Sequence, residues 1–329
     1  MVGLLCEEIE GIISSFGYKS DLAKKICVWI YHRACTSFFE MDNIPVGLRK
    51  MLDNSFSLNL PEYKDVRVSK DGTKKYLFKT HLGKPFETVF MPGQKRRTLC
   101  VSSQSGCRMG CGFCYTGALG YCQNLTTSQI VGQLVAIPER KQVNRLVIMG
   151  MGEPLDNPDA IFKTLEIFNA HWGLAFGAAN ITLSTVGILP MLGRLVDSRS
   201  CNIAISLHSP FPEQRKKLIP AETENPIHGI IDFLKQNPVK KPLRLSFEYV
   251  VIPGVNDSDE HAAETVKLLA SLNCHVNVIS LNTPKENSKK KAFTKDFQRK
   301  LNALGQPATV RISRGIDIDA ACGMMAGRE

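Results

Sequence analysis

Three cysteines within eight residues are the strongest chemical feature of this sequence. Cys107, Cys111 and Cys114 are separated by three and then two residues, in the segment Cys-Arg-Met-Gly-Cys-Gly-Phe-Cys. The glycines of this segment let the backbone approach a bulky inorganic group and point amide N–H groups at its sulfur atoms. The segment therefore predicts a thiolate-bound metal centre in a glycine-rich loop.

The number of thiolates favours an iron–sulfur cluster over zinc. Structural zinc sites take four ligands, commonly in two separated pairs, and no matching second pair follows Cys114. Three thiolates on a four-iron cluster leave one iron without a protein ligand, so that a small molecule can bind there. Three incidental thiols, or an incomplete zinc knuckle, stay open as the alternative at this point.

Composition describes the kind of chain that carries these cysteines. Of 329 residues, 43% are hydrophobic and 22% are charged, so a substantial core can form and general disorder is excluded. The apolar runs are shorter than the roughly 20 residues that span a bilayer, and no export signal is seen; we expect no membrane partner and a cytoplasmic location. Eleven cysteines then indicate a reducing compartment. A net charge of +10 favours a polyanionic partner such as RNA or DNA.

Short β-rich runs alternate with helical segments, and these elements must position the cysteine loop. Strand-then-helix repetition predicts an α/β fold with a parallel sheet and right-handed crossovers. About six such units favour a partial (β/α)6 barrel over a doubly wound sheet. Polar residues and glycines follow one strand after another, which is where barrel enzymes build their sites. The expected strands are 98–102, 145–149, 180–184, 202–207, 243–251, 275–280 and 308–312.

The pattern divides the chain into four parts. Residues 1–60 show helical periodicity and predict a small helical accessory domain, a candidate for RNA docking. Residues 61–92 alternate around Asp71-Gly72, a turn signal, and predict a β-hairpin linker. The barrel core is expected over 93–316. The C-terminal segment 317–329 contains one cysteine, Cys322.

Several motifs in consistent order resemble the radical S-adenosylmethionine (SAM) superfamily and, within it, the RNA adenine methyltransferases RlmN and Cfr. The resemblance runs from about residue 86 to the C-terminus and implies a radical SAM barrel that methylates an adenine of RNA. The matched motifs are LCVSSQSGC at 99–107, MGMGEPL at 149–155, LSTVG at 183–187, SLH at 206–208 and DIDAACG at 317–323.

The resemblance implies a cluster and a cosubstrate. Cys107, Cys111 and Cys114 are then the ligands of a [4Fe-4S] cluster, and SAM, used twice per turnover, binds the open iron. Gly152 and Glu153 match the stretch that receives the methionyl amine, and a carboxylate suits an ammonium partner. The positions that contact the rest of SAM are matched by Ser184, Ser206, Leu207, His208 and Asn282.

Three further residues carry the chemistry that the resemblance implies. Cys322 corresponds to a cysteine that is itself methylated, because carbon 2 of adenine is electron-poor and does not attack a sulfonium methyl group. Cys100 corresponds to its partner, which releases the product by forming a disulfide bond with Cys322. Glu87 corresponds to the proton acceptor. The cysteines expected to be buried small hydrophobes are Cys6, Cys27, Cys35, Cys122, Cys201 and Cys274.

The resemblance also implies the partners. The target is carbon 2 of an adenosine in 23S rRNA, a tRNA adenosine is a second candidate, and an external electron donor such as flavodoxin or ferredoxin is needed. Three alternatives stay open: methylation at carbon 8, as in the antibiotic-resistance relatives; another radical enzyme of this fold; and a non-catalytic RNA-binding module with a structural metal. Basic segments that are candidates for phosphate contact lie at 64–75, 95–97, 215–217, 235–244 and 285–291.

Overall fold

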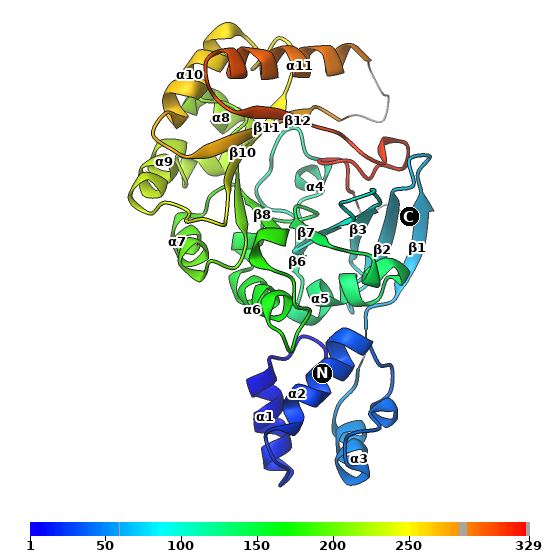
Figure 1. The fold of residues 1–329 in the computed structure, drawn as a ribbon. Helices are drawn as coiled ribbons and strands as arrows, with labels where there is room; N and C mark the ends of the chain where they lie inside the picture. Colours follow the sequence, from blue (N-terminus) through cyan, green and yellow to red (C-terminus); the bar gives the residue numbers. More distant parts are fainter. Residues whose placement is uncertain (59, 283–287, 327–329) are drawn as a thin grey trace.

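A single curved sheet organises the protein in the computed structural model, which describes residues 1–58, 60–282 and 288–326 (Figure 1). Within these residues ten strands join in the order β1-β2-β3-β4-β7-β8-β9-β10-β11-β12. The strands are β1 (Tyr63–Val68), β2 (Lys74–Lys79), β3 (Pro85–Met91), β4 (Thr98–Val101), β7 (Arg145–Ile148), β8 (Ile181–Thr185), β9 (Asn202–Ser206), β10 (Leu245–Val251), β11 (Cys274–Ser280) and β12 (Ala308–Arg311).

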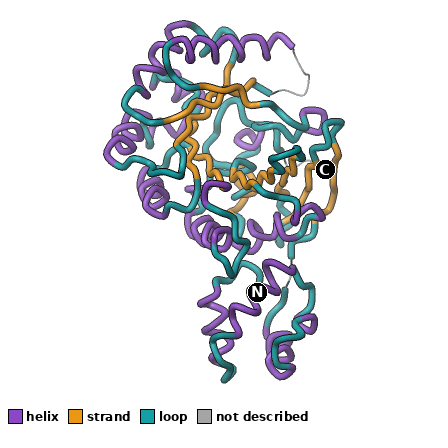
Figure 2. Tube along the Cα trace, viewed as in Figure 1, coloured by secondary structure: helices purple, strands orange, loops and turns teal. Residues whose placement is uncertain are grey.

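The order of the parallel strands confirms the partial barrel. From β4 onward seven strands run parallel, and each pairs with the next one along the chain. A doubly wound sheet reverses its strand order at a switch point, and this sheet does not. It bends around an interior instead, as Figure 2 shows. β1, β2 and β3 add to the β4 edge as antiparallel strands, so the hairpin region continues the barrel sheet.

Most helices cover the outside of the sheet, whereas the short α4 lies inside its curve, after the cysteine loop (Figure 1). Local signals start them: Thr126 and Gln129 form a capping box at the beginning of α5, and Pro158 occupies the first turn of α6. A small hairpin of β5 (Gln104–Gly106) and β6 (Tyr121–Asn124) follows β4. The helices of this part are α4 (Tyr115–Ala118), α5 (Thr127–Val135), α6 (Pro158–Asn169), α7 (Leu189–Ser198), α8 (Pro212–Leu218), α9 (Ile227–Gln236), α10 (Asp259–Leu269) and α11 (Ser288–Ala303).

The N-terminal residues form a helical group that stands at one end of the barrel (Figure 1). It contains α1 (Cys6–Ser15), α2 (Leu22–Cys27), a π-helix (Val28–Arg33) and α3 (Val46–Ser55). Lys163 of α6 pairs with Glu8 at 2.6 Å. Gly3 has φ +88°, and a Cβ there would come within 2.6 Å of the Ser128 nitrogen, so only glycine fits this approach to α5. These contacts fasten the group to the barrel.

The C-terminal segment runs past the tip of the β1–β2 hairpin and then back into the barrel (Figure 1). Asp317 accepts hydrogen bonds from the Ser69 hydroxyl at 2.5 Å and the Lys70 N–H at 3.1 Å. Further on, the Met325 carbonyl accepts from the Thr116 hydroxyl at 2.6 Å. The segment is therefore held on both sides of Cys322. Among the described residues, no helix is long and apolar enough to cross a membrane.

Candidate active site

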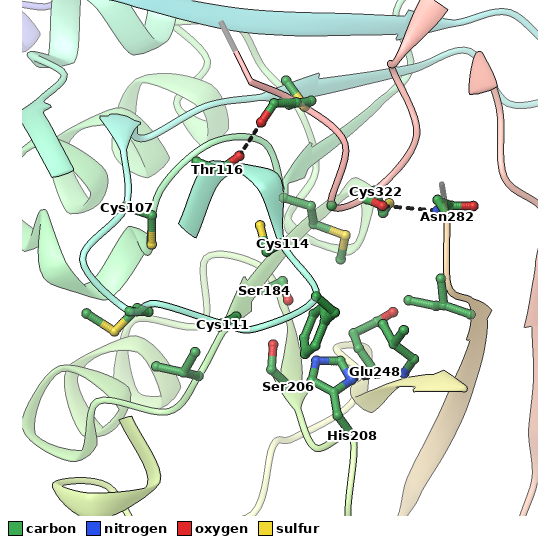
Figure 3. Close-up of a pocket in the computed structure, with 18 of the residues that line it drawn as sticks. Cys107, Cys111, Cys114, Thr116, Ser184, Ser206, His208, Glu248, Asn282 and Cys322 are labelled. Atoms are coloured by element: carbon green, nitrogen blue, oxygen red, sulfur yellow. Dashed lines mark hydrogen bonds between the residues drawn. The ribbon is translucent and has the colours of Figure 1, made fainter. Parts of the chain in front are cut away.

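The three-cysteine loop lies between β5 and α4, beyond the carboxyl end of β4. Cys107, Cys111 and Cys114 are partly buried and line one cavity (Figure 3). The Cys107 N–H donates to the Gly120 carbonyl at 3.0 Å, and the Cys114 N–H donates to the Cys111 carbonyl at 3.1 Å. The loop thus presents three thiols to one space. We call this space the cysteine-loop cavity.

Three thiols around one cavity fit the ligand set of an iron–sulfur cluster. A zinc ion draws its sulfur ligands to about 2.3 Å from one point. Over the part of the chain that the structure describes, no three His, Cys, Asp or Glu side chains are grouped to hold a single metal ion. A four-iron cluster takes one thiolate on each iron atom, so its ligands stand apart around a larger body. Three separate thiols around one cavity meet that requirement.

Burial sets the protonation of these thiols. It raises the pKa of Cys107 to about 12 and also raises the pKa of Cys111, where the neighbouring thiolates of Cys114 and Cys107 add repulsion. Iron ligation removes the thiol proton and supplies positive charge, so it offsets both effects. The loop is therefore chemically suited to cationic metal centres.

Glu153 provides a buried anion on the wall of the same cavity. Its carboxylate accepts hydrogen bonds from the Leu155 N–H at 3.0 Å, the Thr185 hydroxyl at 2.6 Å and the Val186 N–H at 2.9 Å. Burial nevertheless raises the pKa of Glu153 to about 7. A cation bound beside it would favour the charged form. The carboxylate thus suits an ammonium ligand.

The backbone before Glu153 requires glycine. Gly152 has φ +100°, and a Cβ there would lie 2.5 Å from the Gln104 Cβ. A side chain at this position would push the loop after β7 away from the start of β5. Gly152 also lines the cavity, as the resemblance implies.

The polar residues predicted at strand ends meet at this cavity (Figure 3). Ser184 belongs to β8, Ser206 ends β9, and Asn282 follows β11. His208 has φ +56°; its Nδ1 accepts from the Val250 N–H at 2.9 Å. Its ring meets Phe113 of the cysteine loop edge-on, with 4.7 Å between centroids. Burial, and then the charge of Arg215, lowers the pKa of His208 to about 3, so the ring is neutral.

Cys322 lies at the wall between two cavities. It lines the cysteine-loop cavity, and its carbonyl accepts a hydrogen bond from the Asn282 amide at 3.0 Å (Figure 3). It also lines a second cavity together with Cys100 of β4. We call this the thiol cavity. Burial and the nearby Cys322 raise the pKa of Cys100 to about 12. All eleven cysteines are free thiols, so the structure contains no Cys100–Cys322 disulfide.

Two predicted site residues do not reach a cavity surface. Leu207 is completely buried. Glu87 of β3 is also completely buried; its carboxylate pairs with the Lys75 ammonium at 2.9 Å and accepts from the Ala326 N–H at 3.2 Å. Neither residue is among those lining the two cavities. Glu87 instead connects the hairpin with the C-terminal segment.

The sequence patterns did not predict the ion pair between Arg311 and Glu248. Arg311 ends β12 and lines both cavities, and Glu248 lies inside β10. The guanidinium donates to Glu248 at 3.1 Å, and the same carboxylate accepts from the Asn277 amide at 2.8 Å. The available signals were the place of Arg311 near a strand end and the place of Glu248 inside a strand, and neither indicates that the two meet. Its charge faces the region of Cys322 and Cys100.

Arg215, in the basic segment 215–217 that is a candidate for phosphate contact, is unavailable to RNA. Its side chain has no exposed surface and pairs with Glu222 in the interior. The guanidinium donates to the carbonyls of Val186, Ser206 and Leu207, at 3.2, 2.8 and 3.2 Å. Arg215 therefore joins the ends of β8 and β9, where cavity residues lie. A buried guanidinium that donates to this many acceptors stabilises the fold and is not available for a ligand.

Other sequence predictions need smaller corrections. Lys75, in the basic segment 64–75, is buried with Glu87 and is unavailable to RNA. Cys122 is exposed and Cys274 is partly exposed, so neither is a fully buried hydrophobe. Residues 285–287 of the basic segment 285–291 lie outside the described residues.

Comparison with protein-family models finds two matches. Residues 101–269 match the radical SAM superfamily, and residues 1–58 match the ribosomal RNA large subunit methyltransferase N-terminal domain. The first match covers the cysteine loop and most of the parallel strands. The second covers the N-terminal helical group.

Known proteins resemble the chain over its whole length. It is 43% identical to a probable dual-specificity RNA methyltransferase RlmN of Parabacteroides distasonis, over 99% of this chain and 96% of that protein. It is 37% identical to the dual-specificity RNA methyltransferase RlmN of Syntrophus aciditrophicus, over 98% and 94%. A crystal structure of a radical SAM methyltransferase from Sphaerobacter thermophilus superimposes with a TM-score of 0.91 at 37% identity, over 100% of this chain and 99% of that one.

Proposed function

The chain belongs to the RlmN family of radical SAM RNA methyltransferases, and from this we propose that it methylates carbon 2 of an adenosine in 23S rRNA, with tRNA as a further substrate. The observation that supports the proposal most is the place of Cys322, on a wall shared by the cysteine-loop cavity and the thiol cavity. A thiol there has access to a methyl donor on one side and to Cys100 on the other.

The cysteine-loop cavity is the proposed cofactor site. Cys107, Cys111 and Cys114 hold a [4Fe-4S] cluster, and Glu153 receives the ammonium group of SAM. When bound, the cluster would supply the electron for reductive cleavage of one SAM, with flavodoxin or ferredoxin as the electron source. The 5′-deoxyadenosyl fragment would take a hydrogen atom from the methyl group on Cys322, and the cluster would accept one electron back when the adenine adduct loses its ring proton. A second SAM serves as the methyl donor. The remaining SAM contacts come from the residues that line the same cavity, Gly152, Ser184, Ser206, His208 and Asn282, and from the backbone at Leu207.

The chain's own residues perform the transfer in three steps. Cys322, as a thiolate, takes a methyl group from SAM by displacement. Glu87 accepts the proton that leaves the adenine ring once the Cys322-borne carbon has joined it. Cys100, as a thiolate, then attacks the Cys322 sulfur and forms an S–S bond. The C–S bond breaks with its electron pair on the methylene carbon, which takes up a proton and becomes the methyl group of the released base. Reduction of the transient disulfide restores both thiols.

Two features of the structure support this sequence of roles. Cys100 and Cys322 share the thiol cavity, so the attack needs only local rearrangement. Glu87 lies on the same face of β3 as Val89 and Met91, which line that cavity. Because Glu87 bonds the Ala326 N–H, movement of the C-terminal segment would uncover the carboxylate.

Mass spectrometry of nucleosides from methylated RNA tests the proposed function. Iron- and sulfide-loaded enzyme, reductant, SAM and protein-free 23S rRNA should yield 2-methyladenosine. A product of 8-methyladenosine would assign the other carbon. Formation of 5′-deoxyadenosine without methylated RNA would indicate another radical reaction, and the absence of 5′-deoxyadenosine would indicate a structural metal module.

We expect Glu153→Gln to weaken SAM binding by roughly 10- to 100-fold, because a hydrogen bond to a charged group contributes about 1.5–3 kcal/mol. The amide keeps the size of the side chain and removes its charge. Calorimetric titration of the cluster-loaded protein with SAM measures the change in Kd.

Glu139→Gln is the matched control for this substitution. Glu139 is also a buried glutamate, but it pairs with Lys74 and lines neither cavity. Its SAM affinity should equal that of the wild type. Equal affinities for SAM in the wild type, Glu153→Gln and Glu139→Gln would contradict the role given to Glu153.

A further inference from the structure

The thiol cavity has no assigned ligand in the proposed reaction, although it contains both redox-active thiols. The methyl carbon on Cys322 must reach an adenine that lies on the side of Cys322 facing away from bound SAM. The base must also lie where Cys100 can attack the sulfur behind it. Only a position beside both thiols satisfies these two conditions. The walls of this cavity are largely apolar, which suits a flat base: Val89, Met91, Val147, Met149, Ile279 and Met325.

An unusual side chain stands at the mouth of the thiol cavity. Ile312, the first residue after β12, is 78% exposed and lines this cavity. Single exposed apolar residues are common on protein surfaces. Ile312 differs because it follows Arg311 directly and shares its cavity with Cys322 and Cys100.

The loop that carries Ile312 is fastened at several points. Asp71, at the tip of the β1–β2 hairpin, accepts from the Gly315 N–H at 3.2 Å and pairs with Arg314 at 3.8 Å. Asp317 binds the same hairpin tip through Ser69. A loop that is held at these points can keep an apolar side chain in a fixed, solvent-exposed position. A side chain that inserts between stacked bases needs such a fixed position.

Charge near Ile312 suits a polyanion. Arg314, two residues further, lines the thiol cavity and has a side chain that is 39% exposed. Lys70 of the adjacent hairpin tip is exposed as well. Two cations close to an exposed apolar side chain are suited to phosphates next to a displaced nucleotide.

We propose that Ile312 fills the space left in the RNA stack when the target adenosine turns into the thiol cavity, and that Arg314 contacts a neighbouring phosphate. This inference rests on the proposed function and adds to it the route of the base. Apolar side chains act in this way where proteins unstack nucleic acid, and extruding a base costs a few kcal/mol.

Ile312→Ser tests the proposal on a stem–loop RNA whose target adenine is replaced by 2-aminopurine, which fluoresces more strongly when unstacked. Wild type should raise the fluorescence on binding, and Ile312→Ser should lose most of that increase. With the unmodified stem–loop, kcat/KM for methylation should fall by about 10-fold or more. An unstructured RNA carrying the same adenosine should be methylated equally by both proteins, because its base needs no extrusion.

Leu304→Ser is the matched control, since Leu304 is 51% exposed and lines neither cavity. It should match the wild type in both assays. Wild-type fluorescence or wild-type methylation of the stem–loop by Ile312→Ser would overturn the inference. An equal loss on the unstructured RNA would overturn it too, because the defect would then be unrelated to unstacking.

The methylation of Cys322 by SAM without RNA separates this inference from the proposed function. Peptide mass spectrometry should find S-methylated Cys322 in the wild type and in Ile312→Ser alike. Its absence from the wild type would refute the methyl-carrier function itself. Its absence from Ile312→Ser alone would show a defect in the cofactor site and overturn the assignment of Ile312 to RNA.

Discussion

Cys322→Ala is expected to abolish RNA methylation, with a loss on the order of 1,000-fold or more, as for removal of a nucleophile that carries a covalent intermediate. Without this sulfur, the wall shared by the cysteine-loop cavity and the thiol cavity has no thiol among the described residues to carry the methyl group. The assay is transfer of labelled methyl from SAM to 23S rRNA. Cluster absorbance and SAM affinity should stay close to wild type.

Cys122→Ala is the control for this variant. Cys122 is likewise exposed and lies in β6, near the cysteine loop, but it lines neither cavity. It should retain wild-type methylation. Substantial methylation by Cys322→Ala would remove the central premise of the mechanism and favour a different radical reaction.

Cys100→Ala is expected to stop the enzyme after one turnover with the RNA still attached. Cys100 is the thiol that shares the thiol cavity with Cys322, so its loss leaves the C–S bond to the base unbroken. Each active molecule should then accumulate as a covalent protein–RNA adduct. A denaturing gel with labelled RNA detects the adduct, and nuclease digestion followed by peptide mass spectrometry should place it on Cys322.

The control for Cys100 is another buried cysteine. Cys201 is completely enclosed, and burial raises its pKa to about 12, as it does for Cys100, but Cys201 lines neither cavity. Cys201→Ala should turn over repeatedly without forming an adduct. Repeated turnover by Cys100→Ala would mean that product release does not depend on this thiol.

The local patterns of the sequence were sufficient for the scaffold and for the cysteine loop. Strand periodicity and turn residues act over a few positions, so the alternation of strands and helices predicted a parallel barrel, and the structure confirms it. The spacing of Cys107, Cys111 and Cys114 is also local. It places the three thiols in one loop whatever the rest of the chain does, and they line one cavity.

Residues at strand ends could be anticipated for a similar reason. All parallel strands of a barrel end on the same side, so polar residues after successive strands must converge there. Ser184, Ser206, His208 and Asn282 accordingly line one cavity with Glu153. The roles of Cys322 and Cys100 came from a family resemblance rather than from periodicity.

Only the tertiary structure decided which charges are functional and which are structural. Arg215 and Lys216 are neighbours in one basic run, yet Arg215 is enclosed by Glu222 and three carbonyls whereas Lys216 is exposed. Whether a charged side chain is solvated or buried depends on which distant elements pack against it. The spacing of residues in the sequence does not indicate that packing.

The sequence also could not predict that the two cavities share a wall, because this too depends on contacts between distant segments. Cys100 and Cys322 are more than two hundred positions apart, and they meet because the β3–β4 edge and the end of β12 enclose the returning C-terminal segment. By itself the sequence determined the barrel, the cysteine loop and the strand-end site, since each follows from short-range order. The tertiary structure decided the meeting of the two thiols, the Arg311–Glu248 pair and the exposure of Ile312, because each depends on contacts between segments that lie far apart along the chain.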